Sequence, residues 1–156
     1  MIELHPIGHV RSPLVDLASA PRQGDEGAPD ADIVLTGEFV AGLAGIASGD
    51  ELLVLTWLDR ASRNVLSVHP RGELDRPEAG VFTTRSPDRP NPIGLHRVVV
   101  LAVDDGTVRV RDLEAIDGTP VVDIKPVFRE FLPSDPIVQP PWTHELMRNY
   151  WGTRPE

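Results

Sequence analysis

The sequence predicts an all-β protein: a small antiparallel β-barrel with one or two short helices and no Rossmann sheet. Asp105-Gly106 and Asp117-Gly118 lie beside β-branched runs, and such Asp-Gly turns are a strong hairpin signal. Turn residues recur along the whole chain, which has 16 prolines and 13 glycines. Helical periodicity is scarce, and there is no Gly-x-Gly-x-x-Gly loop. The pattern favours seven or eight strands in a closed or nearly closed barrel.

The first strand is expected over residues 2–10, with Ile2, Leu4 and Val10 facing inward. This expectation follows from the alternation of side chains along a strand. A second strand is expected over residues 31–35, after a loop rich in proline and glycine.

A short helix is expected over residues 38–46, because Phe39, Leu43 and Ile46 share one face at helical spacing. Residues 51–58 form a nearly continuous apolar run, which is typical of a buried central strand. Weaker strand signals follow. A strand is expected over residues 65–69, followed by a loop at 70–80. A further strand is expected to begin at 81–84 and to run into Arg85.

The C-terminal half begins with a predicted hairpin of residues 94–103 and 107–113. A further strand is expected over residues 120–124, after the second Asp-Gly turn. Residues 143–150 are predicted to form a terminal helix, with its first residue as N-cap and Gly152 as its stop.

The 156 residues predict one domain over residues 1–156, with an extension carrying the short helix at 129–156. No apolar run approaches the roughly 18 residues of a membrane span. The N-terminus lacks the pattern of a signal peptide. The cytoplasm is therefore the expected compartment. The chain has no cysteine, which excludes disulfides and thiolate metal sites.

The net charge of -9 argues against a protein that coats nucleic acid without specificity. It leaves room for a local basic patch. Lys125 is the only lysine among 15 basic residues, and the others are arginines, which suit bidentate contact with phosphate or carboxylate. Codon usage in a GC-rich genome would give the same bias, so the two explanations stay open.

The segment of residues 81–98 carries the most unusual pattern. Pro87, Pro90 and Pro92 fix their own φ and restrict the residues before them, so the loop has few conformations to lose. Arg85 and Arg89 would then stand on a stiff loop, as an anion-binding site requires. The alternative is a proline-rich turn with solvated arginines.

This segment, VFTTRSPDRPNPIGLHRV, closely resembles the signature of the TsaA-like family, the tRNA threonylcarbamoyladenosine methyltransferases. Four shorter segments match that family in order along the chain, and together the motifs cover residues 2–128. They are residues 7–13, 21–23, 57–60 and 117–126.

The resemblance implies a β-barrel that binds S-adenosylmethionine and acts as a homodimer. It implies methyl transfer to the exocyclic nitrogen of threonylcarbamoyladenosine beside the anticodon of tRNA. By matching positions it also implies the cofactor contacts, which are Gln23, Asp59, Arg60, Arg85, Leu95, Arg111, Asp112, Leu113 and Glu114. Some family members carry His-Gln at the position of Asp59-Arg60, and some carry a further C-terminal domain.

Arg85 and Arg89 are the candidate catalytic residues. The acceptor nitrogen is urea-like and weakly nucleophilic, so an arginine near the carbamoyl oxygen would help it react. The same arginines suit a threonyl carboxylate or a phosphate. Arg85 is expected to be the most function-sensitive arginine, whereas Arg71 and Arg76, in the predicted outer loop, are expected to tolerate alanine.

Two other functions stay open at this stage. One is a methyltransferase of a small metabolite, and the other is a non-catalytic barrel that binds a nucleotide or RNA. No metal is expected, because His5 and His9 lie too far apart on a predicted strand to share one ion. His96 either lies in the pocket or is an ordinary strand histidine.

Overall fold

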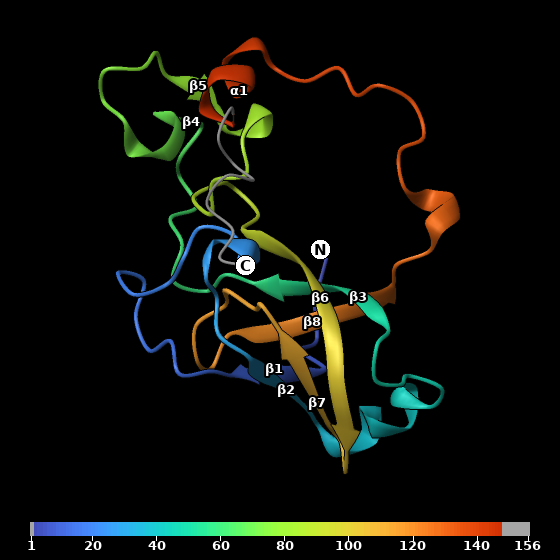
Figure 1. The fold of residues 1–156 in the computed structure, drawn as a ribbon. Coiled ribbons are helices and arrows are strands. Elements are labelled where there is room, and N and C mark those ends of the chain that lie inside the picture. The colour runs from blue at the N-terminus through green and yellow to red at the C-terminus, as the bar shows by residue number, and fades with distance from the viewer. Residues whose placement is uncertain (1, 148–156) are drawn as a thin grey trace.

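Six strands close into a barrel in the computed structural model, which describes residues 2–147 (Figure 1). Around the barrel the order is β1-β2-β7-β6-β3-β8, and every neighbouring pair is antiparallel. The strands are β1 Gly8–Arg11, β2 Ala31–Leu35, β3 Glu51–Trp57, β6 Ile93–Asp104, β7 Thr107–Arg111 and β8 Pro120–Pro126. Because β1 pairs with both β2 and β8, this sheet has no free edge. The prediction of an antiparallel barrel without a Rossmann sheet is confirmed.

The predicted hairpin joins β6, the longest strand, to β7. Asp105 and Gly106 both have positive φ, 37° and 78°, as a type I′ turn requires. The register shifts between Val100 and Ala102. Such a bulge bends the strand and increases its twist, which helps a sheet of only six strands to close.

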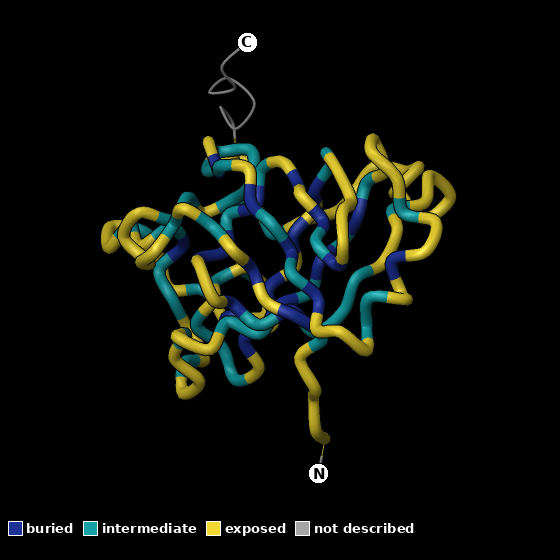
Figure 2. The backbone as a smooth tube through the Cα atoms, turned by 90° about the horizontal axis from the view of Figure 1, so that it is seen from below, coloured by how far each residue is buried: buried dark blue, intermediate teal, exposed yellow. Residues whose placement is uncertain are grey.

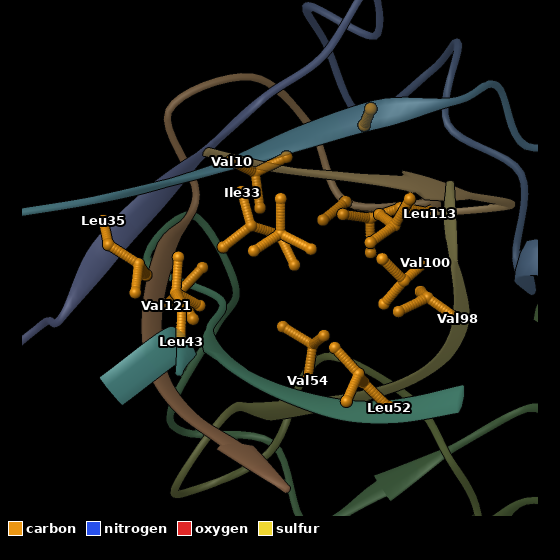
Figure 3. Close-up of a cluster of buried hydrophobic side chains, with 14 residues drawn as sticks. Val10, Ile33, Leu35, Leu43, Leu52, Val54, Val98, Val100, Leu113 and Val121 are labelled. Carbon is orange, nitrogen blue, oxygen red and sulfur yellow. The ribbon is translucent and has the colours of Figure 1, made fainter. Parts of the chain in front are cut away.

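The barrel interior is filled by alternate side chains of the strands, most of them valines. Buried residues gather in the centre of the molecule, while the loops are exposed (Figure 2). Val10, Ile33, Val54, Val100 and Leu113 point toward one another across this interior (Figure 3). Full burial of each such side chain contributes about 1.5–3 kcal/mol. The alternation predicted from the sequence therefore produces a packed core.

One end of the barrel is covered by η2, the 3-10 helix Gly37–Leu43. Leu43 is buried in the core, and Phe39, Val40 and Ile46 pack against it. The short helix predicted here is confirmed, in a tighter 3-10 form. The opposite end, where β3 ends and β6 begins, is surrounded by loops.

A small lobe stands over that loop-lined end. It contains the two-stranded sheet of β4 and β5, and α1 lies beside this sheet (Figure 1). Its elements are β4 Ser67–Val68, β5 Ala79–Gly80, η3 Pro70–Gly72, η4 Val81–Thr83 and α1 Pro141–Leu146. Two further 3-10 helices are η1 Gly24–Glu26, before β2, and η5 Arg129–Phe131, after β8. No helix within residues 2–147 has both the length and the apolarity to cross a membrane.

The predicted first strand is wrong at its beginning. β1 starts only at Gly8, and Ile2 and Leu4 are 92% and 51% exposed instead of facing inward. β2 ends at Leu35, the partner of Gly8, and Pro6 has no N–H with which to extend the ladder along β8. Only Val10 is buried as expected.

The strand predicted from Val81 is also wrong, because these residues form η4. The hydroxyl of Thr83 donates to the carbonyl of Gly80 (2.8 Å), and that of Thr84 donates to the carbonyl of Val81 (3.0 Å). Such local bonds compete with a strand ladder. The strand expected at residues 65–69 is reduced to the two residues of β4.

The terminal helix begins two residues earlier than predicted. Pro141 opens α1, and Thr143 is not the N-cap, since its hydroxyl donates to the carbonyl of Pro140 (2.6 Å). Proline suits a first helical position because its missing N–H would have no partner there. The predicted continuation over residues 148–150 and the stop at Gly152 lie outside the described residues.

Candidate functional site

A large cavity of about 1410 Å³ lies between the loop-lined end of the barrel and the lobe. Its walls come from η1, the loop after β3, the lobe, the start of β6 and the approach to β8. Ordinary small-molecule pockets have volumes of roughly 300–1,000 Å³. This cavity, called the pocket below, therefore has room for more than one small ligand.

The side chain of Arg89 holds the proline-rich loop together through hydrogen bonds to its backbone. Its Nε donates to the carbonyl of Ser86 (2.7 Å), and its Nη2 donates to the carbonyls of Thr84 (2.6 Å) and Val81 (3.0 Å). The proline-rich loop is also tied to the loop after β3, because the backbone N–H of Arg89 donates to the carbonyl of Ser62. The rigidity expected from the prolines is thus reinforced by a side chain, and this geometry favours a positioning role for Arg89.

Arg85 stands on the pocket wall with its side chain exposed. Its Nη2 donates to the carbonyl of Leu95 (3.1 Å). A guanidinium has five N–H donors, so this bond orients the group and leaves capacity for an anion. Its backbone is held by η4 and Pro87, rather than by the strand ladder expected from the sequence.

A polar group is buried where the barrel opens into the pocket. His96 is only 5% exposed, and its Nε2 lies 2.8 Å from Oγ1 of Thr56. Its Nδ1 lies 2.8 Å from Oε1 of Glu114, whose side chain is 15% exposed and lines the pocket. Sequence reasoning left His96 open and did not single out Thr56. The register of β3 against β6 brings the two together, and no spacing rule reveals that register.

The structure brings six of the nine predicted cofactor residues to the pocket wall, together with Arg89. They are Gln23, Asp59, Arg60, Arg85, Leu95 and Glu114. The other three lie elsewhere. Leu113 is fully buried in the core, Arg111 is exposed at the end of β7, and Asp112 has a left-handed backbone with a φ of 61°. A Cβ on Gly24 would clash with the carbonyl of Asp112, so this stretch meets the pocket through the contact of its backbone with η1.

Arg71 was expected to be an outer-loop residue that tolerates alanine, but the structure places it on the pocket wall and gives it a partner. Its Nη2 lies 2.5 Å from Oε1 of Glu26, and both side chains are largely buried at the pocket. The pair ties the lobe to η1 across 45 residues of sequence, so no local pattern could indicate it. Arg76 is paired as well, with Glu73 and Glu145, and its hydrogen bond to Glu73 raises the pKa of its guanidinium.

Arginines and carboxylates both line the pocket of this acidic protein. The arginines are Arg22, Arg60, Arg71, Arg85 and Arg89, and the carboxylates are Asp25, Asp59, Asp88 and Glu114. Mixed charge of this kind suits a ligand that carries both signs. Within residues 2–147 no three His, Asp or Glu side chains gather closely enough to hold a metal ion.

The structure is thus that of a small antiparallel β-barrel protein with a binding pocket of mixed charge at one end. The chain belongs to the tRNA-methyltransferase O N-terminal domain family, whose sequence pattern matches residues 9–131. The family resemblance stated from the motifs is thereby confirmed.

Curated relatives carry names that refer to the cofactor. The chain is 48% identical over 122 residues to an S-adenosyl-L-methionine-binding protein of Archaeoglobus fulgidus, covering 78% of this chain and 86% of that protein. It is 43% identical over 129 residues to a probable S-adenosyl-L-methionine-binding protein of Methanothermobacter thermautotrophicus, covering 83% and 92%.

Solved structures share the fold. The crystal structure of TrmO from Pseudomonas aeruginosa superposes with a TM-score of 0.71 at 25% identity, covering 91% of this chain. The chain spans 62% of the length of that protein. A further TrmO crystal structure has a TM-score of 0.70 at 25% identity, covering 97% of this chain and 76% of its own.

Proposed function

We propose that this protein transfers a methyl group from S-adenosylmethionine to the exocyclic nitrogen of threonylcarbamoyladenosine, next to the anticodon of tRNA. The observation that carries the proposal is the pocket. It gathers six of the nine residues that match the family's cofactor positions, and it is large enough for a cofactor and a nucleoside together.

The residues present fit the proposed cofactor. S-adenosylmethionine carries a carboxylate, an ammonium group, ribose hydroxyls and a sulfonium. Arg85 suits the carboxylate, and Glu114 and Asp59 suit the ammonium group or the hydroxyls. A Cβ on Gly24 would stand 3.3 Å from Oε2 of Glu114, a tight contact, and 2.2 Å from the carbonyl oxygen of Asp112, so glycine lets η1 pack closely against this stretch.

Apolar side chains on the pocket wall provide a place for adenine rings. Phe82 and Leu95 line the pocket and are 79% and 44% exposed. Large exposed apolar side chains are unfavourable in water, and an aromatic base would cover them. Both the cofactor and the proposed acceptor contain adenine.

Positioning dominates the proposed chemistry. When bound, the cofactor supplies an electrophilic methyl group. The protein must then hold the acceptor nitrogen in line with it, which supplies on the order of 7–11 kcal/mol. Arg85, which the proposal places at the carboxylate of the cofactor, is held in position by the loop that Arg89 keeps rigid.

A tRNA substrate is supported by where the arginines lie. Although the net charge of the protein is -9, arginines slightly outnumber carboxylates on the pocket wall, five against four. Local positive charge attracts a phosphate backbone even on an acidic protein. We propose that the reaction takes place in the cytoplasm, where tRNA is modified. We also propose that residues 1–156 form one domain.

We also propose a homodimer. Five apolar side chains between β8 and α1 are at least 42% exposed, and a second copy would cover them. They are Phe128, Phe131, Leu132, Ile137 and Val138. Sedimentation at micromolar concentration should give twice the mass of one 17.1 kDa chain, and a single 17.1 kDa species would contradict the dimer.

The proposal is tested with purified protein, S-adenosylmethionine and tRNA taken from a strain that lacks the gene. Methylated threonylcarbamoyladenosine should appear in the nucleosides of the treated tRNA. Cofactor binding without this product would favour a small-molecule methyltransferase. Binding of S-adenosylmethionine and S-adenosylhomocysteine without any turnover would favour a non-catalytic module.

A further inference from the structure

We propose that His96 is a positioning residue: with Thr56 behind it, its ring fixes the carboxylate of Glu114 in the pocket, ready for a cationic or hydroxyl group of the cofactor. This inference rests on the proposed function, because it assigns Glu114 to S-adenosylmethionine. It concerns three residues from three parts of the chain, namely β3, β6 and the loop between β7 and β8.

The first support is the way the barrel holds the ring. Thr56 is fully buried and pairs across the β3–β6 ladder with Gly94, two residues before His96 on β6. A Cβ on Gly94 would stand 2.7 Å from Nε2 of His96 and would also clash with Oγ1 of Thr56. The hydrogen bond between these two side chains therefore passes directly over Gly94, and only glycine leaves it room.

The second support is the other ring nitrogen. Nδ1 of His96 is buried and makes no well-directed hydrogen bond within the described residues, yet Oε1 of Glu114 stands 2.8 Å away. The carboxylate is thus close to Nδ1 but off the line of its N–H. A buried polar atom costs free energy unless it is paired, so this arrangement favours a small rotation that completes the bond.

The proton positions follow from the chemistry of the three groups. A carboxylate only accepts hydrogen bonds, whereas a threonine hydroxyl both donates and accepts. In the neutral ring the proton therefore belongs on Nδ1, facing Glu114, while the hydroxyl of Thr56 donates to Nε2. Once that bond forms, Oε1 of Glu114 accepts from the ring, and Oε2, which lies beside Gly24 of η1, stays free for the proposed ligand.

Leucine has a side chain of similar size to histidine, so His96→Leu removes both polar contacts without a large change in volume. Asparagine keeps a hydrogen-bond donor near the position of Nδ1. In calorimetry, His96→Leu should bind S-adenosylmethionine at least ~10-fold more weakly than wild type, as expected for a lost charge-assisted bond. His96→Asn should stay within about 3-fold of wild type. The double variant His96→Leu/Glu114→Gln should bind no more weakly than Glu114→Gln, because His96 acts through Glu114.

Val98→Ala is the matched control. Val98 is 1% exposed and points into the core from the same strand, so its truncation lowers the melting temperature without touching the pocket. It should leave the affinity unchanged. Equal effects of His96→Leu and Val98→Ala on melting and affinity, or additive losses in the double variant, would overturn the positioning role.

The position of the proton on the His96 ring can be measured without the cofactor, and the measurement does not require that His96→Leu folds. Long-range ¹H–¹⁵N spectra of the five histidine rings should show the ring of His96 with its proton on Nδ1, and Glu114→Gln should alter that signal. A ring protonated on Nε2 alone would overturn the inference while leaving the proposed function intact. Wild-type protein that does not bind S-adenosylmethionine would overturn both.

Discussion

Replacing Arg85 by alanine should weaken binding of S-adenosylmethionine by roughly 10- to 150-fold and leave the protein folded. The size of the effect follows from the geometry. The guanidinium is exposed on the pocket wall and gives one N–H to the carbonyl of Leu95 at 3.1 Å, so it contributes little to the fold. One hydrogen bond to a charged ligand group is worth about 1.5–3 kcal/mol, which corresponds to that loss of affinity.

The assay is calorimetry with thermal melting as the check on folding. Arg85→Lys should restore only part of the affinity, because a point charge cannot reproduce a two-pronged contact. Arg109→Ala is the control, since this side chain is 54% exposed on the barrel wall and stands 3.9 Å and 3.6 Å from Asp30 and Asp32. If folded Arg85→Ala binds and transfers like wild type, the pocket assignment is wrong.

Three further variants test the architecture around the pocket. Arg89→Ala should lower the cofactor affinity by loosening the proline-rich loop rather than by removing a contact with the cofactor, so Arg89→Lys should not restore it. Full activity of Arg89→Ala would refute this positioning role. Gly94→Ala should lower the melting temperature markedly, because its Cβ would collide with the Thr56–His96 pair; an unchanged melting curve would contradict the packing described. Glu26→Gln should weaken cofactor binding by releasing Arg71 from η1, and wild-type affinity would show that the pair is not needed.

The barrel was predictable because its determinants are local. The β-branched runs, the alternation of buried positions and the Asp105-Gly106 turn all lie within a few residues of the elements they specify. The errors occurred where ladders or side-chain bonds decide instead. β2 ends opposite Gly8, so the residues before Gly8 lack a partner on that side, and the hydroxyls of Thr83 and Thr84 close η4 in place of a strand.

The pocket was predictable only in part. The motif around Arg85 and Arg89 indicated an anion-binding loop, and the family resemblance supplied residues such as Glu114. The contact of Arg71 with Glu26 joins two segments that are 45 residues apart in the sequence. The contact of His96 with Thr56 joins residues 40 positions apart and depends on the register of β3 against β6. Neither follows from composition or spacing. The sequence also could not separate Arg89, whose side chain holds the loop together, from Arg85, whose side chain is exposed, because both lie on the same loop.

The most direct test of the proposed activity is mass spectrometry of tRNA nucleosides from a strain that lacks the gene. Methylated threonylcarbamoyladenosine should disappear and its unmethylated form should accumulate. A plasmid that encodes the wild-type protein should restore the methylated nucleoside, whereas one that encodes Arg85→Ala should restore little of it. An unchanged nucleoside profile in the deletion strain would contradict the proposal that tRNA is the substrate.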